Sequence, residues 1–317
     1  MSNKANIIFL FSGQGSQYRG MGRILYEQNH IFSSCIKECD QIVRKLLNRS
    51  LIDELYHIED KDFSDLLITH PAIVAVEIAM FRVLEAINIK PDLVVGTSLG
   101  EFAAGVACGF WDLDKAISAA AEQAKLIAKN VARGGMISVT NSFSCEIESI
   151  YAKHNLILAS ENFKKHFTIA GLASDLDSCE ITFKKAGIDY VRLPIDYPFH
   201  TNLMDACENE CFYHSFNVFN PSKQLTGFIS GLRSDKMEIL PENYFWQAVG
   251  KYFDFSKLIG YTESLGTAIY VDLGPSGTAA TFTKYNLDPL SESFSIQIMT
   301  PFRTELRQLE ELQRTLS

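Results

Sequence analysis

The sequence has no excess of positive charge and no uninterrupted apolar segment long enough to cross a membrane. Its 317 residues include 29 lysines and arginines against 38 aspartates and glutamates, which gives a net charge of −9. Nucleic-acid binding depends on clustered lysine and arginine, so an acidic chain is a poor candidate for it. The longest apolar stretch, Ile73 to Ile89, is interrupted by Glu77, Arg82 and Glu85, which is typical of an amphipathic helix. We therefore expect neither a nucleic-acid partner nor a membrane partner.

Cysteine is scarce and shows no pattern that would bind a metal. The seven cysteines are an odd number, they are scattered along the chain, and no paired Cys-x-x-Cys motif of the zinc type occurs. The first residues, Met1 to Asn6, do not form the basic segment that precedes a longer apolar one in a secretory signal. Together these features predict reduced thiols, a cytoplasmic location and no metal site.

Apolar runs alternate with helical patterns in the first part of the chain. Asn6 to Phe11 and Pro91 to Val95 have the short, continuously apolar sequence of buried strands, and each is followed by a glycine-containing turn. Between them, Pro71 to Ile87 has apolar residues at helical spacing. Helices between buried strands predict an α/β domain with a parallel sheet.

The middle of the chain has a different rhythm. From Met136 to Pro194 the expected order is strand, helix, strand, strand, helix, strand, which is the ferredoxin-like pattern. The glycines at 134 and 135 and the proline at 194 interrupt regular structure on either side, as hinges do. We therefore predict a large α/β domain formed by residues 1–134 and 195–317, with a small subdomain, residues 135–194, inserted in it.

The strongest local motif is Gly96-Thr97-Ser98-Leu99-Gly100, which matches the G-x-S-x-G nucleophile elbow. A strand must turn sharply into a helix there, and glycine on both sides lets the backbones approach while the serine adopts a strained conformation. The hydroxyl then projects at the carboxyl end of the sheet, beside backbone N–H donors of the following helix. Because an apolar strand precedes the motif and a segment of small residues follows it, we predict that Ser98 is a nucleophile.

A serine nucleophile needs a base, and seven histidines are available. Chain order does not choose among them, because catalytic triads occur in several orders. His200 is favoured, since it lies where the chain leaves the small subdomain, and loops between rigid elements often carry catalytic groups. The other histidines are His30, His57, His70, His154, His166 and His214.

A second loop is expected at the same edge of the sheet. The segment Ser12-Gly13-Gln14-Gly15-Ser16-Gln17 directly follows the first strand, and open α/β sheets bind ligands at the carboxyl ends of their strands. A dinucleotide site is not indicated, because the pattern Gly-x-Gly-x-x-Gly would need glycine where Tyr18 stands.

Four motifs carry a resemblance to a known family. They are Phe11-Ser12-Gly13-Gln14-Gly15-Ser16-Gln17, Gly96-Thr97-Ser98-Leu99-Gly100-Glu101, Phe199-His200 and Gly274-Pro275-Ser276-Gly277. Over most of its length, from Asn6 to Phe302, the chain resembles the malonyl-CoA:acyl carrier protein transacylase family, which includes the acyltransferases of fatty acid and polyketide synthases. The resemblance implies a hydrolase-like α/β core with a parallel sheet and an inserted ferredoxin-like small subdomain. It also implies a Ser98–His200 dyad, an oxyanion hole from Gln14 and the backbone N–H of Leu99, and a place near the active site for Asn162.

Two positions depart from the family pattern. Thr97 stands where the family usually has histidine before the nucleophile. Gln123 stands where malonyl-using members carry the arginine that pairs with the free carboxylate of the substrate, and no arginine occurs between Ile87 and Val131. A neutral glutamine leaves a buried carboxylate uncompensated, at a cost on the order of several kcal/mol. We therefore expect acyl chains without a terminal carboxylate, contacted by Gln123, Asn162, Thr97 and Phe199.

A stand-alone chain with these motifs and glutamine in place of arginine resembles the acyl hydrolases of trans-acyltransferase polyketide pathways. The resemblance implies that water attacks an acyl-Ser98 intermediate with His200 as the base, so that wrong or stalled acyl groups are removed from carrier proteins. It implies an acyl carrier protein and polyketide synthase modules as partners and an acyl thioester as substrate. The phosphopantetheine arm would arrive on the partner, and we expect a monomer without a bound cofactor.

Three alternatives stay open. A transferase would move malonyl or another acyl group from coenzyme A to a carrier protein, with Gln123 only tuning selectivity. An unrelated α/β-hydrolase esterase would need an acid after the nucleophile and a histidine late in the chain, and it would not explain Gln14 or the small subdomain. A catalytically inactive interaction module is disfavoured because the chain keeps both Ser98 and His200.

Overall fold

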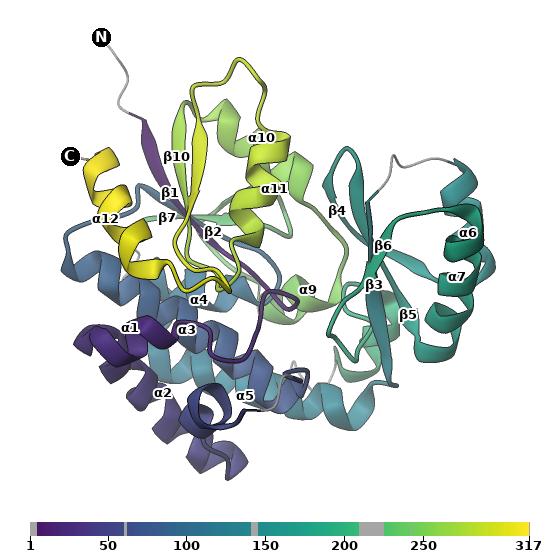
Figure 1. The fold of residues 1–317 in the computed structure, drawn as a ribbon, viewed down its shortest axis with the longest axis horizontal. Helices are drawn as coiled ribbons and strands as arrows, with labels where there is room; N and C mark the ends of the chain where they lie inside the picture. The colour runs from purple at the N-terminus through teal and green to yellow at the C-terminus, as the bar shows by residue number, and fades with distance from the viewer. Residues whose placement is uncertain (1–4, 60–61, 141–144, 209–224, 242, 317) are drawn as a thin grey trace.

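The computed structural model describes residues 5–59, 62–140, 145–208, 225–241 and 243–316. Its strands form two sheets, and Figure 1 shows the smaller sheet beside the larger one with helices around both. The strands are β1 Asn6–Phe11, β2 Leu93–Gly96, β3 Gly134–Thr140, β4 Ile157–Phe163, β5 His166–Leu172, β6 Tyr190–Arg192, β7 Gly227–Ser230, β8 Asp235–Met237, β9 Phe253–Asp254, β10 Ala268–Asp272 and β11 Phe294–Gln297. The helices are α1 Arg23–Gln28, α2 His30–Leu47, η1 Asp53–His57, α3 Leu66–Ala86, α4 Gly100–Ala107, α5 Leu113–Asn130, α6 Cys145–Lys153, α7 Ala173–Ala186, η2 Asn202–Cys207, α9 Tyr244–Gly250, α10 Phe255–Ser264, α11 Thr278–Asn286 and α12 Glu305–Leu316.

The larger sheet has the strand order β11-β10-β1-β2-β7-β8. Its neighbouring strands run parallel, apart from β7 and the edge strand β8, which run antiparallel. The predicted parallel sheet is confirmed; β1 has the predicted limits, whereas β2 begins two residues later than Pro91. Phe11 at the end of β1 pairs with Gly96 at the end of β2. The two loops that carry the predicted nucleophile and Gln14 therefore start side by side at one edge of the sheet.

The two faces of β1 are buried against different helices. Phe9 and Phe11 lie in the core that includes residues of α2, α3 and α5, while Ile8 and Leu10 pack with residues of α10 and α11. Figure 1 shows these two groups of helices on either side of the strand. Burial on both faces explains why the strand is continuously apolar.

The long helix α3 is not amphipathic, contrary to the interpretation of its sequence. It is buried on nearly all sides, including Glu77, because α2, α4 and α5 all pack around it. By length and composition α3 could cross a membrane, but 83% of its most apolar window is buried inside the protein. Asp65 caps its N-terminus by accepting a hydrogen bond from the Leu67 N–H, so the helix begins before Pro71, where it was expected to begin.

The smaller sheet has the strand order β6-β3-β5-β4-β9. Its elements follow the predicted sequence of β3, α6, β4, β5, α7 and β6. Ile137, Val139, Phe167 and Ile169 share a separate apolar core with residues of α6 and α7. The fifth strand, β9, pairs in parallel with β4 and was not foreseen, since two residues are too few for a periodic signal. The proposed division into residues 135–194 and the rest stays a prediction, and the sheet itself extends to Phe253–Asp254.

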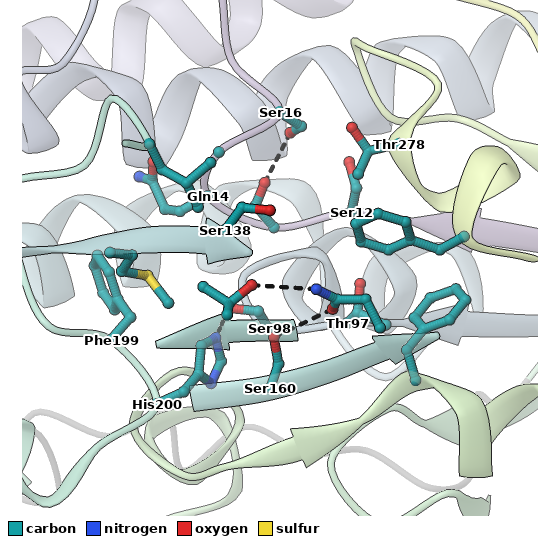
Figure 2. Close-up of a pocket in the computed structure, with 18 of the residues that line it drawn as sticks. Ser12, Gln14, Ser16, Thr97, Ser98, Ser138, Ser160, Phe199, His200 and Thr278 are labelled. Atoms are coloured by element: carbon teal, nitrogen blue, oxygen red, sulfur yellow. Dashed lines mark hydrogen bonds between the residues drawn. The ribbon is translucent and has the colours of Figure 1, made fainter. Parts of the chain in front are cut away.

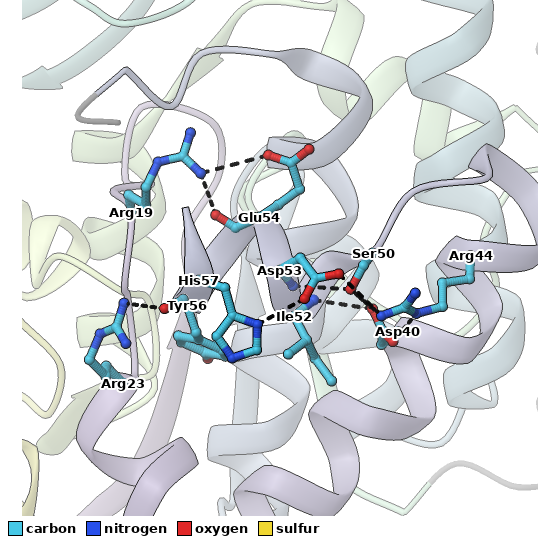
Figure 3. A network of polar contacts seen from close by, with 10 residues as sticks. All are labelled: Arg19, Arg23, Asp40, Arg44, Ser50, Ile52, Asp53, Glu54, Tyr56 and His57. Atoms are coloured by element: carbon cyan, nitrogen blue, oxygen red, sulfur yellow. Dashed lines mark hydrogen bonds and ion pairs between the residues drawn. The ribbon is translucent and has the colours of Figure 1, made fainter. Parts of the chain in front are cut away.

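The chain that follows β1 is fastened to η1 by two arginines (Figure 3). Arg19 donates a hydrogen bond to the backbone carbonyl oxygen of Glu54, and Arg23 donates one to that of Tyr56 at 2.8 Å. The ring of Tyr56 also lies under the Arg23 guanidinium, 5.6 Å from its carbon. These bonds connect the segment that follows the Ser12 loop to the backbone of η1.

Candidate active site

Ser98 lies at the sharp turn between β2 and α4, as its motif predicts. Its φ is +55°, in the left-handed region that residues other than glycine rarely adopt. A Cβ atom on Gly96 would clash with the backbone of Glu101, and one on Gly100 would clash with the carbonyl group of Phe11. Glycine is required at both positions because the first turn of α4 lies directly against the ends of β1 and β2.

The imidazole of His200 lies against the side chain of Ser98 (Figure 2). Its Nε2 lies 2.8 Å from Ser98 Oγ, and its Nδ1 lies 2.9 Å from the carbonyl oxygen of Lys251. A carbonyl oxygen only accepts hydrogen bonds, so Nδ1 carries the proton and Nε2 offers its lone pair to the serine hydroxyl. This is the tautomer that a general base needs, and a backbone carbonyl rather than a carboxylate orients the ring.

Burial keeps the imidazole of His200 neutral. Its side chain is buried, and this burial lowers its pKa to about 4. An unperturbed histidine has a pKa of about 6.5. His200 therefore stays in its basic form well below neutral pH. The same shift means that its contribution to folding stability is complete above about pH 6.5 and is lost as the pH falls toward the pKa of the folded state.

We predict that the reactivity of Ser98 falls only in acid. Its labelling rate by a fluorophosphonate, measured in short exposures, should stay level from about pH 8 to 5 and decline as His200 becomes protonated near its pKa of about 4. Circular dichroism at each pH controls for unfolding, and hydrolysis of the probe alone gives the background. A midpoint near pH 6.5 would contradict the burial of His200.

Gln14 and Leu99 lie where an oxyanion hole is expected. A Cβ atom on Gly13 would stand 2.7 Å from Ser98 Cβ, so the loop backbone just before Gln14 touches Ser98. Neither the backbone N–H of Gln14 nor that of Leu99 has a hydrogen-bond partner in the described part of the chain. The N–H of Gly100, by contrast, is bonded to the Thr97 carbonyl oxygen. Two free donors beside the serine fit the stabilisation of a negatively charged oxygen.

A cavity of about 340 Å³ opens between the two sheets and contains the serine and the histidine. It is also lined by four other residues that the sequence singled out, Gln14, Thr97, Asn162 and Phe199. Thr97 Oγ1 donates to the Phe11 carbonyl oxygen at 3.1 Å, so its hydroxyl proton is already used. The remaining lining residues are Ser12, Gly13, Gly15, Ser16, Met136, Ser138, Ser160, His166, Thr168, Val191, Leu193, Phe253, Phe255, Thr278, Ala279 and Phe282.

Gln123 is not among the described residues that line this cavity, and the expectation that it contacts the substrate stays a prediction. Its side chain is 1% exposed and lies behind His70, whose Nε2 is 3.0 Å from Gln123 Oε1. His70 in turn stacks on Phe199 with 5.9 Å between ring centroids and is bonded to the side chain of Gln14. The side chain of Gln123 on α5 therefore contacts His70 and is not part of the described lining of the cavity.

His70 is one residue beside this site to which the sequence analysis assigned no role. Gln14 Nε2 donates to its Nδ1 at 2.8 Å and to Thr69 Oγ1 at 3.2 Å. Nδ1 is then an acceptor, so the Nε2–H of His70 donates to Gln123 Oε1. Burial lowers the pKa of His70 to about 4, so the chain from Gln14 to Gln123 is neutral. The available signal was a Thr-His pair inside an otherwise apolar run from 66 to 76.

Buried carboxyl groups hold the loops around the site. Glu101 Oε1 accepts hydrogen bonds from the N–H groups of Gly231 and Leu232, and burial raises the pKa of Glu101 to about 8. Asp272 accepts from the N–H groups of Gly274 and Ala280, both at 2.8 Å, and burial raises its pKa to about 6. The motif that begins at Gly274 therefore serves to bind Asp272 and shape the loop beside the cavity.

The arrangement is suited to acyl transfer through a serine ester. It combines a serine hydroxyl, a neutral histidine whose Nε2 lies close enough to accept its proton, and two unpaired backbone donors. Within the described residues, no group of three or more histidine, cysteine, aspartate or glutamate side chains is placed to bind a metal ion.

Comparison with known proteins identifies both a family and a fold. The acyl transferase domain family matches residues 8–244. The chain is 35% identical over 309 residues to the polyketide biosynthesis acyltransferase homolog PksD of Bacillus subtilis, covering 96% of this chain and 94% of that protein. It is 30% identical over 315 residues to the homolog BaeD of Bacillus velezensis, with coverage of 98% and 96%. The crystal structure of MCAT from Streptococcus pneumoniae is similar with a TM-score of 0.78 and 25% identity, covering 96% of this chain and 99% of that one.

Proposed function

This chain belongs to the acyltransferase family of the polyketide synthase type, and from that premise we propose that it is an acyl hydrolase of acyl carrier protein thioesters. It removes acetyl and other chains that lack a free carboxylate, through an acyl-Ser98 intermediate, and so clears wrong or stalled acyl groups in polyketide biosynthesis. Family membership excludes the unrelated esterase that the sequence left open.

The first half of the reaction transfers the acyl group to the enzyme. Ser98 Oγ attacks the thioester carbonyl carbon while its proton passes to His200 Nε2. The backbone N–H groups of Gln14 and Leu99 hold the oxyanion that forms. Collapse of this intermediate breaks the carbon–sulfur bond, and the proton on His200 leaves with the thiol of the phosphopantetheine arm.

The second half releases the acid. His200 Nε2 takes a proton from a water molecule as the water oxygen attacks the acyl-Ser98 carbonyl. The same backbone donors hold the second oxyanion. Collapse returns the proton from His200 to Ser98 Oγ and frees the carboxylic acid.

The lining of the cavity supports a neutral acyl chain. None of the described lining residues is lysine or arginine. Gln123, which stands in place of the family's arginine, is paired with His70, and both are uncharged. A substrate carboxylate would therefore enter a site without a counter-charge, which is costly.

We further propose the setting of the reaction. The partners are an acyl carrier protein and polyketide synthase modules, and the phosphopantetheine arm comes with the carrier protein. The enzyme works as a cytoplasmic monomer and needs no cofactor of its own. The second candidate function is transfer of an acyl group from coenzyme A to the carrier protein, which the names of the curated relatives favour.

The two functions differ in what happens to a loaded carrier protein. We expect intact-mass spectrometry to show that carrier protein loaded with acetyl or butyryl returns to the free phosphopantetheine form, while malonyl-loaded carrier persists. Spontaneous loss without enzyme is the control. Malonyl loading of empty carrier from malonyl-CoA, with stable acetyl and butyryl forms, would establish the transferase instead.

A further inference from the structure

One face of the small sheet places five polar side chains in the cavity. These residues, Ser138, Ser160, Asn162, His166 and Thr168, are called the polar platform below. Side chains on a strand alternate between faces, and the intervening Ile137, Val139, Phe167 and Ile169 fill the apolar core under α6 and α7. The platform thus covers the side of the sheet that looks toward Ser98 and His200.

The platform runs across three neighbouring strands in register. Thr168 on β5 is paired with Ser138 on β3 and with Ser160 on β4. The side chains of Ser138, Ser160, Asn162 and Thr168 are each 8% exposed or less. Buried polar groups need hydrogen-bond partners. The platform residues bond to one another, but these bonds do not use every donor.

The hydrogen bonds of the platform have a definite direction. Asn162 Nδ2 donates to His166 Nδ1 at 2.9 Å and to Thr168 Oγ1 at 3.1 Å, while its Oδ1 accepts from Ser160 Oγ at 3.2 Å. His166 Nδ1 is therefore an acceptor, and burial lowers the pKa of this ring, which stays neutral. Its proton lies on Nε2 and is donated to Ser138 Oγ at 2.7 Å.

Two hydroxyl protons remain unused. The oxygens of Ser138 and Thr168 both accept, and in the described part of the chain neither hydroxyl has an acceptor for its own proton. Since His166 donates to Ser138, it cannot also remove the proton of that serine, so Ser138 is not arranged as a second nucleophile. Both hydroxyls face a cavity in which a ligand oxygen could accept from them.

We propose that the polar platform binds neutral acceptor oxygens of the thioester substrate, with the hydroxyls of Ser138 and Thr168 as donors. This inference rests on the proposed function only in assuming that a thioester enters the cavity. The platform carries no charged group, which suits amide, ketone or hydroxyl oxygens and not phosphate or carboxylate. Such oxygens occur in two parts of the substrate, the amides of the pantetheine arm and oxygen substituents on the acyl chain.

The test compares thioesters that share one acyl group but differ in their arm. Acetyl thioesters of ethanethiol, N-acetylcysteamine and pantetheine contain no, one and two amides. We expect Ser138→Ala and Thr168→Val each to lower kcat/KM for thiol release from the pantetheine ester by about three- to tenfold, the effect of one neutral hydrogen bond. The ethanethiol ester should react with the variants as with the unchanged protein. Ser178→Ala, at an exposed position of α7 in the same subdomain, is the matched control.

The second arm of the test compares butyryl and 3-hydroxybutyryl esters of N-acetylcysteamine. A loss that grows with the number of amides assigns the platform to the arm, and a loss confined to the 3-hydroxy ester assigns it to the acyl chain. Equal loss on all esters, or no loss on any, overturns the proposal.

Thiol release reports acylation of Ser98 whatever acceptor follows, so failure of hydrolysis would be a separate result. Calorimetric binding of a pantetheine thioether to the Ser98→Ala protein, compared with the same protein carrying Ser138→Ala, tests the arm without turnover, and equal affinities exclude it.

Discussion

Replacing Ser98 by alanine is expected to reduce acyl release from a carrier protein by at least about a thousandfold, because it removes the atom that forms the ester intermediate. His200→Ala should cost a similar factor, since the hydroxyl then has no base at 2.8 Å to accept its proton. The two residues act as one unit, so the double variant should be scarcely slower than either single one. The measurement is the rate at which acetyl-loaded carrier returns to its free form.

Two controls make this result specific. His57→Ala alters a histidine that is exposed and paired with Asp53, and it should leave the rate unchanged. Ser98→Ala should change the thermal midpoint only slightly, because alanine keeps the Cβ atom of the turn at φ +55° and loses only the hydroxyl that contacts His200. Release that persists in Ser98→Ala at more than about a hundredth of the normal rate would refute a serine ester intermediate.

Replacing Gln123 by arginine is expected to destabilise the protein and to give no use of malonyl groups. Residue 123 is 1% exposed and faces the Nε2–H of His70, a donor that cannot bind a guanidinium, which is itself only a donor. Its other partner is the Phe245 carbonyl oxygen, at 3.4 Å. A buried cation without a carboxylate costs on the order of 3–5 kcal/mol. The free energy of unfolding from denaturant titration and malonyl loading of the carrier protein check the two parts.

Lys125→Arg is the matched control for this substitution. Lys125 lies on the same helix, but its side chain is 38% exposed and pairs with Glu122, so arginine there should be neutral in stability. A Gln123→Arg protein that unfolds at the same denaturant concentration as the original and loads malonyl groups would show that residue 123 alone determines the acyl class. The coupling to His70 would then have no part in selectivity.

Part of the site could be predicted because its requirements are local. The turn at Ser98 has no room for a Cβ atom at Gly96 or Gly100. Such a steric requirement is visible in a short sequence motif. The loop that holds Gln14 follows β1 without interruption, so its place at the sheet edge follows from the strand itself. The catalytic roles assigned to Ser98 and His200 stay predictions, but the structure brings the two residues into the contact that those roles need.

Other parts could not be predicted from the spacing of apolar residues. That spacing shows which face of a helix is apolar, but not how many other elements pack against the helix. The spacing of apolar residues in α3 indicated an amphipathic helix, yet the helix is covered by α2, α4 and α5. Gln123 was expected to contact the substrate because its position matches that of the family's arginine. Matching a position to a family motif does not show which side chain contacts it. Here the side chain of Gln123 contacts His70.

The sequence by itself determined the strands and turns that carry Ser98 and Gln14, the α/β class, and the absence of arginine between Ile87 and Val131. These properties depend on short stretches of chain and on residue type. The sequence favoured His200, and the tertiary structure brings it to Ser98, 102 positions away. Only the tertiary structure decided that Gln14, His70 and Gln123 form one neutral chain. It alone also decided that five polar residues of three strands face the cavity. Such contacts arise when distant elements pack, and hydrogen-bond direction and burial are properties of that packing.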